Sequence, residues 1–107
     1  MNETTIRTES ATTVYIDHTE ASYGIFCFNQ TGDLFLNADW GFYGFSWRAY
    51  QGDFKDFLKK CDADYITKKL GMNFNTNASR DNRFGGKREK NVRLLVEVFL
   101  TELRNSL

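Results

Sequence analysis

Few side chains in this chain of 107 residues are suited to acid–base or nucleophilic chemistry. Its one histidine, His18, would be the natural general base, because imidazole changes its charge near neutral pH. The sequence around His18 contains acids and threonine, but neither a serine-rich turn nor a cysteine that would serve as a nucleophile beside it. We therefore interpret His18 as a surface residue at the end of a strand, and we expect no catalytic residues and no enzymatic activity.

Ligands for a metal ion or a cofactor are also scarce. A structural zinc site needs four Cys or His ligands with short paired spacings, whereas this chain has only His18, Cys27 and Cys61, which are widely separated. The segment GGKR at positions 85–88 lacks the glycine spacing and the hydroxyl residue after lysine that a phosphate-binding loop requires. The sequence therefore predicts neither a bound metal nor a cofactor.

One set of carboxylates keeps a hydrolytic alternative open. Glu20, Asp33 and Asp39 lie in predicted turns or at strand edges, and carboxylates of this kind bind divalent ions that activate water. Acids at such positions more commonly serve as caps and turn formers. Metal-dependent hydrolysis is therefore the third function that we consider, after two binding functions.

The densest chemical feature is aromatic, because six of the eleven residues from position 40 to 50 are Trp, Tyr or Phe. Successive side chains of a strand point to opposite faces, so this strand would be aromatic on both. One face carries Trp40 and Phe42, and the other carries Tyr43, Phe45 and Trp47. Trp, Tyr and Arg dominate the energetic centres of protein interfaces. We expect the exposed members of this segment to contact a protein partner, and the candidates are Tyr43, Phe45, Trp47, Arg48 and Tyr50.

Two alternatives would hide the aromatic strand from such a partner. As a central strand it would be covered on both faces within one chain. A second copy of the chain would cover the surplus face in a two-fold arrangement, so a homodimer stays open.

Charge is unevenly distributed, although 14 Lys and Arg balance 14 Asp and Glu. Residues 1–50 hold six acids and two bases, whereas residues 51–107 hold eight acids and twelve bases. We expect part of the basic excess to contribute to partner contacts, namely Arg80, Arg83, Lys87 and Arg88. Direct nucleic-acid binding by residues 80–93 is the second function that we consider. The same charges would also suit a solvated loop and helix start.

The composition limits the class of protein. With 41% hydrophobic and 16% aromatic residues, the chain can bury enough apolar surface to fold, which excludes a wholly disordered protein. No uncharged apolar run approaches the roughly 18–20 residues that cross a bilayer, so no membrane span is expected. The N-terminus lacks the basic and apolar regions of a secretory signal. We therefore expect a cytoplasmic location, in which Cys27 and Cys61 stay free thiols.

Strand patterns occupy the first half of the chain. β-Branched and aromatic residues alternate in Thr12–Asp17 and Tyr23–Asn29. A turn in which Gly32 supplies a positive φ leads into Leu34–Ala38, and the aromatic segment makes a fourth strand. Short connections between consecutive strands favour an antiparallel meander.

Helical spacing of apolar residues follows in the second half. Asp53 is the expected N-cap of a short helix over residues 54–60. Asp62 or Asp64 caps a second short helix, which Gly71 ends.

The last pattern is an apolar stripe over residues 88–105, which predicts a C-terminal helix packed on the sheet. We therefore expect an α+β fold with an antiparallel sheet of about four strands, two short helices and this C-terminal helix. Residues 1–11 would be a flexible N-terminus, and residues 12–107 would form a single domain with a mobile basic loop at about 72–87.

Three stretches of the chain resemble a pattern found in small proteins of phages and prophages. They are GDLFLNADWGFYGFSWR at positions 32–48, DFKDFL at 53–58 and DYITKKL at 64–70. The resemblance implies an origin in a mobile element. Short phage proteins without enzymatic motifs are often inhibitors of host defence, including anti-CRISPR proteins. The resemblance therefore implies a non-enzymatic inhibitor whose partner is a host protein or nucleoprotein complex, and it assigns a role to no particular residue.

Overall fold

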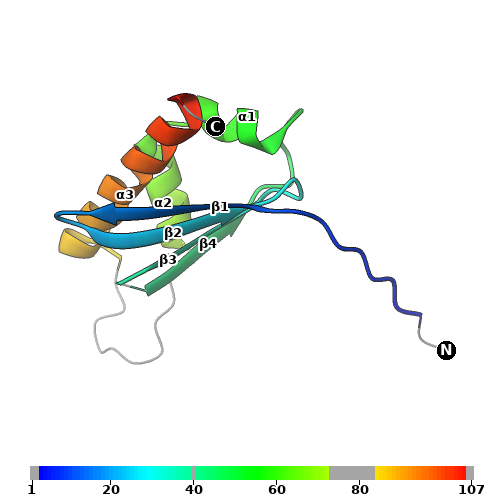
Figure 1. Ribbon diagram of the computed structural model, residues 1–107, viewed down its shortest axis with the longest axis horizontal. Helices are drawn as coiled ribbons and strands as arrows, with labels where there is room; N and C mark the ends of the chain where they lie inside the picture. Colours follow the sequence, from blue (N-terminus) through cyan, green and yellow to red (C-terminus); the bar gives the residue numbers. More distant parts are fainter. Residues whose placement is uncertain (1–2, 40, 73–83, 106–107) are drawn as a thin grey trace.

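The computed structural model describes residues 3–39, 41–72 and 84–105 of the chain. Within these residues four strands come first and three helices follow (Figure 1). The strands are β1 (Thr12–His18), β2 (Ser22–Phe28), β3 (Asp33–Ala38) and β4 (Gly41–Ser46). The helices are α1 (Phe54–Lys60), α2 (Ala63–Met72) and α3 (Gly86–Asn105). This arrangement confirms the predicted α+β fold.

The described strands form one antiparallel sheet in the order β1-β2-β3-β4, which is the predicted meander. The turn between β2 and β3 requires a glycine, because Gly32 has a φ of 96°. The carbonyl oxygen of Gly32 accepts a hydrogen bond from the N–H of Trp47 at 2.8 Å. A Cβ atom at position 32 would collide with the carbonyl oxygen of Trp47. The turn is thereby held against the chain that leaves β4.

Side-chain hydrogen bonds mark the helix ends. The Asp53 carboxylate accepts from the backbone N–H two residues on, at 2.8 Å, and caps α1 as predicted. The Asp62 carboxylate accepts from the N–H three residues on, at 2.8 Å, so Asp62 rather than Asp64 caps α2. The Arg104 guanidinium of α3 donates to two carbonyl oxygens at the end of α1, at 3.0 and 2.6 Å. These contacts tie the last helix to the first.

The prediction that Gly71 ends the second helix is wrong. Helix α2 continues through Gly71 to Met72. The ring of Phe84 lies where a side chain at position 71 would be, and a Cβ atom there would collide with it. Gly71 therefore permits the close approach of Phe84 to α2 instead of serving as a cap.

Helix α3 begins at Gly86, two residues earlier than predicted. The predicted loop at about 72–87 is therefore shorter at both ends, since Met72 belongs to α2 and Lys87 to α3. Residues 73–83 lie outside the described residues. Of the helices in the described part of the chain, none has both the length and the apolar character that crossing a membrane requires.

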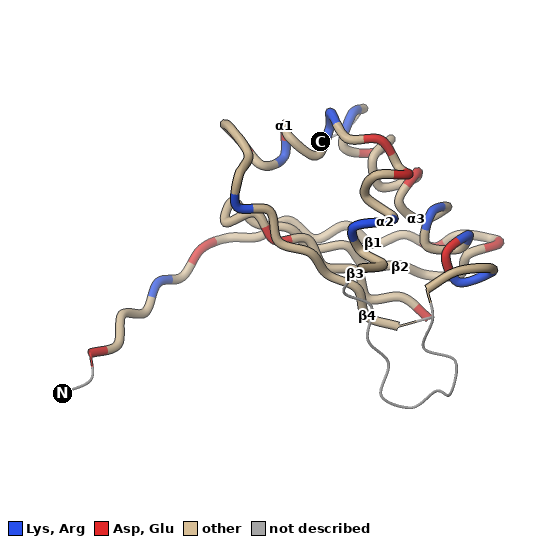
Figure 2. The backbone as a smooth tube through the Cα atoms, turned by 180° about the vertical axis from the view of Figure 1, so that it is seen from behind, with Lys and Arg blue, Asp and Glu red and all other residues tan. Residues whose placement is uncertain are grey.

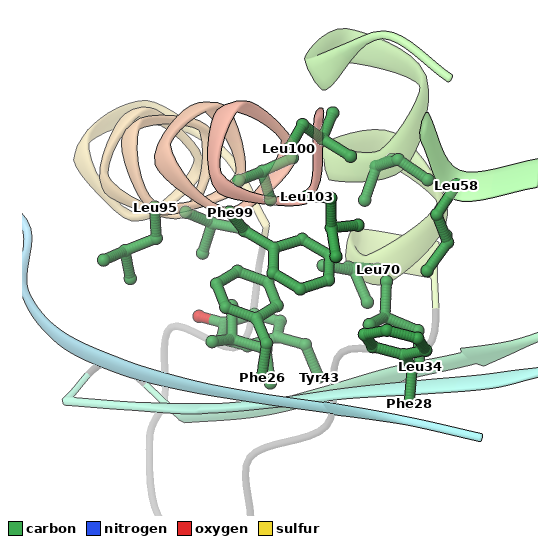
Figure 3. Close-up of a cluster of buried hydrophobic side chains, with 14 of the residues drawn as sticks. Phe26, Phe28, Leu34, Tyr43, Leu58, Leu70, Leu95, Phe99, Leu100 and Leu103 are labelled. Carbon is green, nitrogen blue, oxygen red and sulfur yellow. The ribbon is translucent and has the colours of Figure 1, made fainter. Parts of the chain in front are cut away.

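All three helices lie over the same face of the sheet (Figure 1). Phe26 of β2 stacks on Phe99 of α3, with ring centroids 4.2 Å apart. Phe28 meets Phe99 edge-on, and Figure 3 shows these rings between the sheet and leucines of the helices. Because a strand has a period of two, alternate positions of β2 and β3 supply the sheet side of the core. These residues are Phe26, Phe28, Leu34, Leu36 and Ala38.

A second group of rings fastens α1 and α2 to the end of β4. The centroid of Trp47 lies 5.7 Å from that of Phe54 and 5.9 Å from that of Phe57. Its indole N–H donates a hydrogen bond to the Tyr65 hydroxyl at 3.0 Å. Trp47 thus satisfies its one polar group while it buries its ring.

We expect Gly32→Ala to lower the free energy of unfolding by about 1–3 kcal/mol, because alanine is strained at this φ and its methyl group would meet the Trp47 carbonyl. Urea denaturation followed by tryptophan fluorescence measures the loss. Gly52→Ala is the matched control, since Gly52 also has a positive φ, 77°, but open space around its Cβ position. Equal losses in the two variants would contradict the packing described for the turn.

Candidate functional site

One face of the sheet is covered by none of the described helices (Figure 1). We call it the outer face and define it by the strand residues that alternate with the core positions. They are Thr13, Tyr15, Asp17, Tyr23, Ile25, Cys27, Phe35, Asn37 and Phe42. Tyr15 is 76% exposed, Phe42 71% and Phe35 53%. Soluble monomers rarely expose large contiguous apolar patches, and such a patch usually marks an interaction site.

The strand register makes these side chains neighbours. One row crosses all four strands through Tyr15, Ile25, Asn37 and Phe42. Phe35 lies in the adjacent row, opposite a cysteine of β2 and a glycine of β4. Directly opposite residues have Cβ atoms about 4.5–5.5 Å apart, and diagonal neighbours are within reach of aromatic rings. The outer face is therefore one continuous patch.

Two of the predicted contact residues belong to the core instead of the surface. Tyr43 is 3% exposed and Trp47 is 8% exposed, so their expected exposure is corrected. Figure 3 shows Tyr43 pointing from the sheet toward the helices. Burial raises the pKa of the Tyr43 phenol to about 12. The physical reason is alternation, because the helices cover the face of β4 that carries Tyr43.

Phe45 and Tyr50 are half-buried and serve the same core. The Phe45 ring lies 4.8 Å from that of Trp47, and the ammonium of Lys69 lies 5.1 Å from its centroid. The Tyr50 hydroxyl donates to the carbonyl oxygen of Gln30 at 2.5 Å. Both side chains therefore make contacts within the protein, whereas the sequence predicted that they contact a protein partner.

Arg48 braces the turn between β2 and β3. Its guanidinium donates to the Thr31 carbonyl at 2.8 Å and to the Asp33 carboxylate at 2.9 Å. The Ser46 hydroxyl donates to the same carboxylate at 2.6 Å. This hydroxyl is the largest cause that holds the pKa of Asp33 below its usual value, and Arg48 adds to it against the opposing effect of burial. Arg48 is therefore a structural residue, although 59% of its side chain is exposed.

The two predicted basic contacts that the structure describes lie on the other side of the molecule from the outer face. Lys87 and Arg88 occupy the first turn of α3. This helix packs over the face of the sheet that the helices cover, which we call the inner face (Figure 2). Arg93 donates to a carboxylate of α2 at 2.8 Å and to one of its own helix at 3.2 Å, so its charge is partly neutralised. Arg80 and Arg83 lie outside the described residues.

The carboxylates of the hydrolytic alternative are not brought together. Asp33 and Asp39 flank opposite ends of β3, which at 3.3 Å per residue separates them by about 20 Å. Asp39 accepts a hydrogen bond from the Ser22 hydroxyl instead. Within residues 3–39, 41–72 and 84–105, no cluster of three or more His, Cys, Asp or Glu has the geometry to hold a metal ion. A hydrolytic site built from Glu20, Asp33 and Asp39 is therefore wrong.

His18 closes the connection between β1 and β2. Its Nδ1 accepts hydrogen bonds from the backbone N–H groups of Glu20 and Ala21, at 3.0 and 3.1 Å. Ser22 follows with a φ of 67°, a left-handed conformation that tight connections use. His18 is thus a turn residue with two backbone partners.

A hollow of about 240 Å³ lies where the N-terminal segment meets the end of β2. Its lining provides hydroxyl and amide groups but no charged side chain. The lining residues are Ser10, Ala11, Thr12, Phe28, Asn29 and Gln30. The hollow therefore lacks the groups that acid–base chemistry or an ionic ligand would need.

Comparison with known proteins identifies the family. A family model described as a phage family matches residues 4–105. The chain belongs to this phage family. Neither the search of curated proteins nor the search of solved structures returned a significant match. The expected phage origin is therefore confirmed, and the function of the phage protein stays a prediction.

The exposed rings of the phage protein, Tyr15, Phe35 and Phe42, were not among the contact residues predicted from the sequence. The sequence contained a signal for these rings, because polar residues alternate along the strands on the same face as the rings. Asn37 and Asp17 alternate with aliphatic residues in their strands, which marks their side of the sheet as the one that faces water.

We expect Asp33→Asn to reduce stability at neutral pH by roughly 1 kcal/mol, because it removes a charged acceptor from hydrogen bonds with Ser46 and Arg48. The lowered pKa of Asp33 gives the sign of the pH dependence. Its contribution is complete above the unfolded value of about 3.9 and is lost as the pH falls through the lower folded value.

Thermal melts of the wild type and of Asp33→Asn from pH 7 to pH 3 test this expectation. The difference between the two melting temperatures should shrink on acidification. Glu102→Gln, at an exposed position of α3, is the control and should show no such trend. A difference that is constant with pH would contradict the ionic role of Asp33.

Proposed function

We propose that this phage protein is a non-enzymatic binding protein that acts through protein contacts at its outer face. The observation that carries the proposal is the patch with three exposed rings on a sheet face that no described helix covers. Tyr15 and Phe42 lie at its two ends, on the two edge strands, and Phe35 lies between them. Burying large rings of this kind on a partner contributes more binding free energy than most other interface contacts.

A protein partner fits this surface better than a nucleic acid does. Proteins that stack bases on aromatic side chains pair those rings with Lys or Arg that neutralise the phosphates. Between Arg7 and Arg48 the sequence has no Lys or Arg, and this stretch contains all four strands. A phosphate chain lying across the outer face would therefore meet acids instead of bases.

The proposed partner is a component of a host defence complex, as for anti-CRISPR proteins. Membership of a phage family supports a role in infection. An inhibitor that occupies a surface needs one exposed, well-ordered patch and no catalytic groups. The outer face provides such a patch on four strands that hydrogen-bond to one another in one sheet.

We expect the double variant Tyr15→Ser, Phe42→Ser to lose inhibition. Wild-type protein expressed in the bacterial host should restore plating of a phage that a nuclease-based defence system of that host restricts. The double variant should lower this restored plating at least tenfold, since loss of one well-buried ring costs about 1.4 kcal/mol or more. Both side chains are exposed, so the fold should be kept.

Val98→Ser is the matched control, because Val98 is an exposed apolar residue on α3, away from the outer face. It should inhibit as well as the wild type. Two results would contradict the proposal: relief of none of the host's defence systems by the wild type, or full inhibition by the double variant.

Direct nucleic-acid binding by the start of α3 is the second candidate function. It is favoured by the three cations Lys87, Arg88 and Lys90 within four positions. Removing one cation that neutralises a phosphate should lower the slope of log affinity against log salt by about one. Lys87→Gln, Lys90→Gln should therefore change that slope by about two in an oligonucleotide titration. Absence of saturable binding by the wild type at 0.15 M salt would exclude this function.

A further inference from the structure

The part of the chain that forms the sheet carries acids and no bases. Positions 8–47 contain five Asp and Glu and no Lys or Arg. Two of these acids have an ion pair, Asp33 with Arg48 at 2.9 Å and Glu9 with Arg7 at 4.0 Å. No ion pair involves Asp17, Glu20 or Asp39 within the described residues. The unneutralised acids therefore belong to the end of the sheet that holds the β1–β2 connection.

One of these acids, Asp17, lies on the outer face, and a second, Asp39, follows the last paired residue of β3 at the same end of the sheet. Asp17 lies directly opposite Tyr23. Asp39 follows Ala38, the last paired residue of β3, and has the same parity as Phe35 and Asn37. The Ser22 hydroxyl donates to the Asp39 carboxylate, which holds this acid against the start of β2. Asp17 and Asp39 thus flank Tyr23 at one end of the patch.

The bases of the chain lie elsewhere. Helices α1, α2 and α3 carry nearly all of the described Lys and Arg, and they cover the inner face (Figure 2). None of the strand residues that define the outer face is a Lys or Arg, so the face has no cation of its own to offset these acids. A partner that supplies Lys or Arg opposite Asp17 and Asp39, around a site for the rings, has the complementary charge.

We infer that the partner of the outer face is a basic protein surface, in which Lys and Arg side chains surround an apolar site that receives Tyr15 and Phe42. This inference rests on the proposed function and adds the chemical class of the partner. Complementary charge of this kind raises the association rate and makes binding depend on salt. The aromatic rings supply the part of the affinity that salt does not remove.

The test uses a twelve-residue peptide of alternating Arg and Trp as the probe, with a peptide of alternating Glu and Trp as its control. Binding is measured by titration at 50 and 300 mM salt, and the contact surface is mapped by backbone amide shifts in NMR. The Arg–Trp peptide should shift amides of β1 and β4, and its affinity should fall at least fivefold at the higher salt. The Glu–Trp peptide should not bind.

Charge variants test whether the acids contribute to peptide binding in addition to the rings. Asp17→Asn, Asp39→Asn should weaken binding of the Arg–Trp peptide at least fivefold at 50 mM salt. Glu97→Gln, Glu102→Gln removes the same charge from exposed positions of α3 and should change affinity less than twofold. Equal effects of the two pairs, or amide shifts confined to α3, would overturn the inference.

The outcomes separate this inference from the proposed function. If Tyr15→Ser, Phe42→Ser abolishes inhibition in cells while Asp17→Asn, Asp39→Asn changes neither inhibition nor peptide binding, the basic partner is wrong and the outer face remains the binding surface. If neither pair affects inhibition, both proposals fail. A dimer of the wild type in sedimentation that Tyr15→Ser, Phe42→Ser dissociates would instead assign the face to a second copy and overturn the inference.

Discussion

The stack of Phe26 on Phe99 determines which face of the sheet this protein buries. Both rings are fully buried, with centroids 4.2 Å apart. Once β2 turns Phe26 toward α3, the alternation of side chains fixes which residues of every paired strand face the helices. A strand could present its other residues only if its register shifted. Tyr43 then joins the core and Phe42, its neighbour, faces solvent. The outer face is thus a consequence of how the core is built.

The same division separates the charges. The helices carry both bases and acids (Figure 2), whereas the four strands carry Asp17 and Asp33 and no base, so the covered side of the molecule is mixed in charge and the sheet itself has only acids. Ion pairs such as Arg93 with Asp64 connect helices to each other. Arg48 is the base closest in sequence to the strands, and it is bonded to Asp33. A partner for the outer face must bring its own cations.

Most of the fold could be predicted from the sequence, because its signals are local. Gly32 requires a turn, Asp53 caps a helix, and alternation marks the strands. The aromatic part of the candidate site could not be predicted from β4 alone. Position 42 and position 43 are both aromatic, so alternation within β4 names two faces without saying which one the helices cover. That choice depends on long-range packing of α3 on β2, and Gly71 illustrates the same limit, because Phe84 rather than the local sequence explains it.

The most direct test of the outer face as a binding surface is hydroxyl-radical footprinting of the free protein, read by mass spectrometry at its aromatic residues. Tyr15, Phe35 and Phe42 should be oxidised rapidly, whereas Tyr43 and Trp47 should be strongly protected. In a complex with the partner, the first three should become protected while the other two stay unchanged. Protection of Tyr15 and Phe42 in the free monomer, or their continued oxidation in the complex, would contradict the outer face as the binding surface.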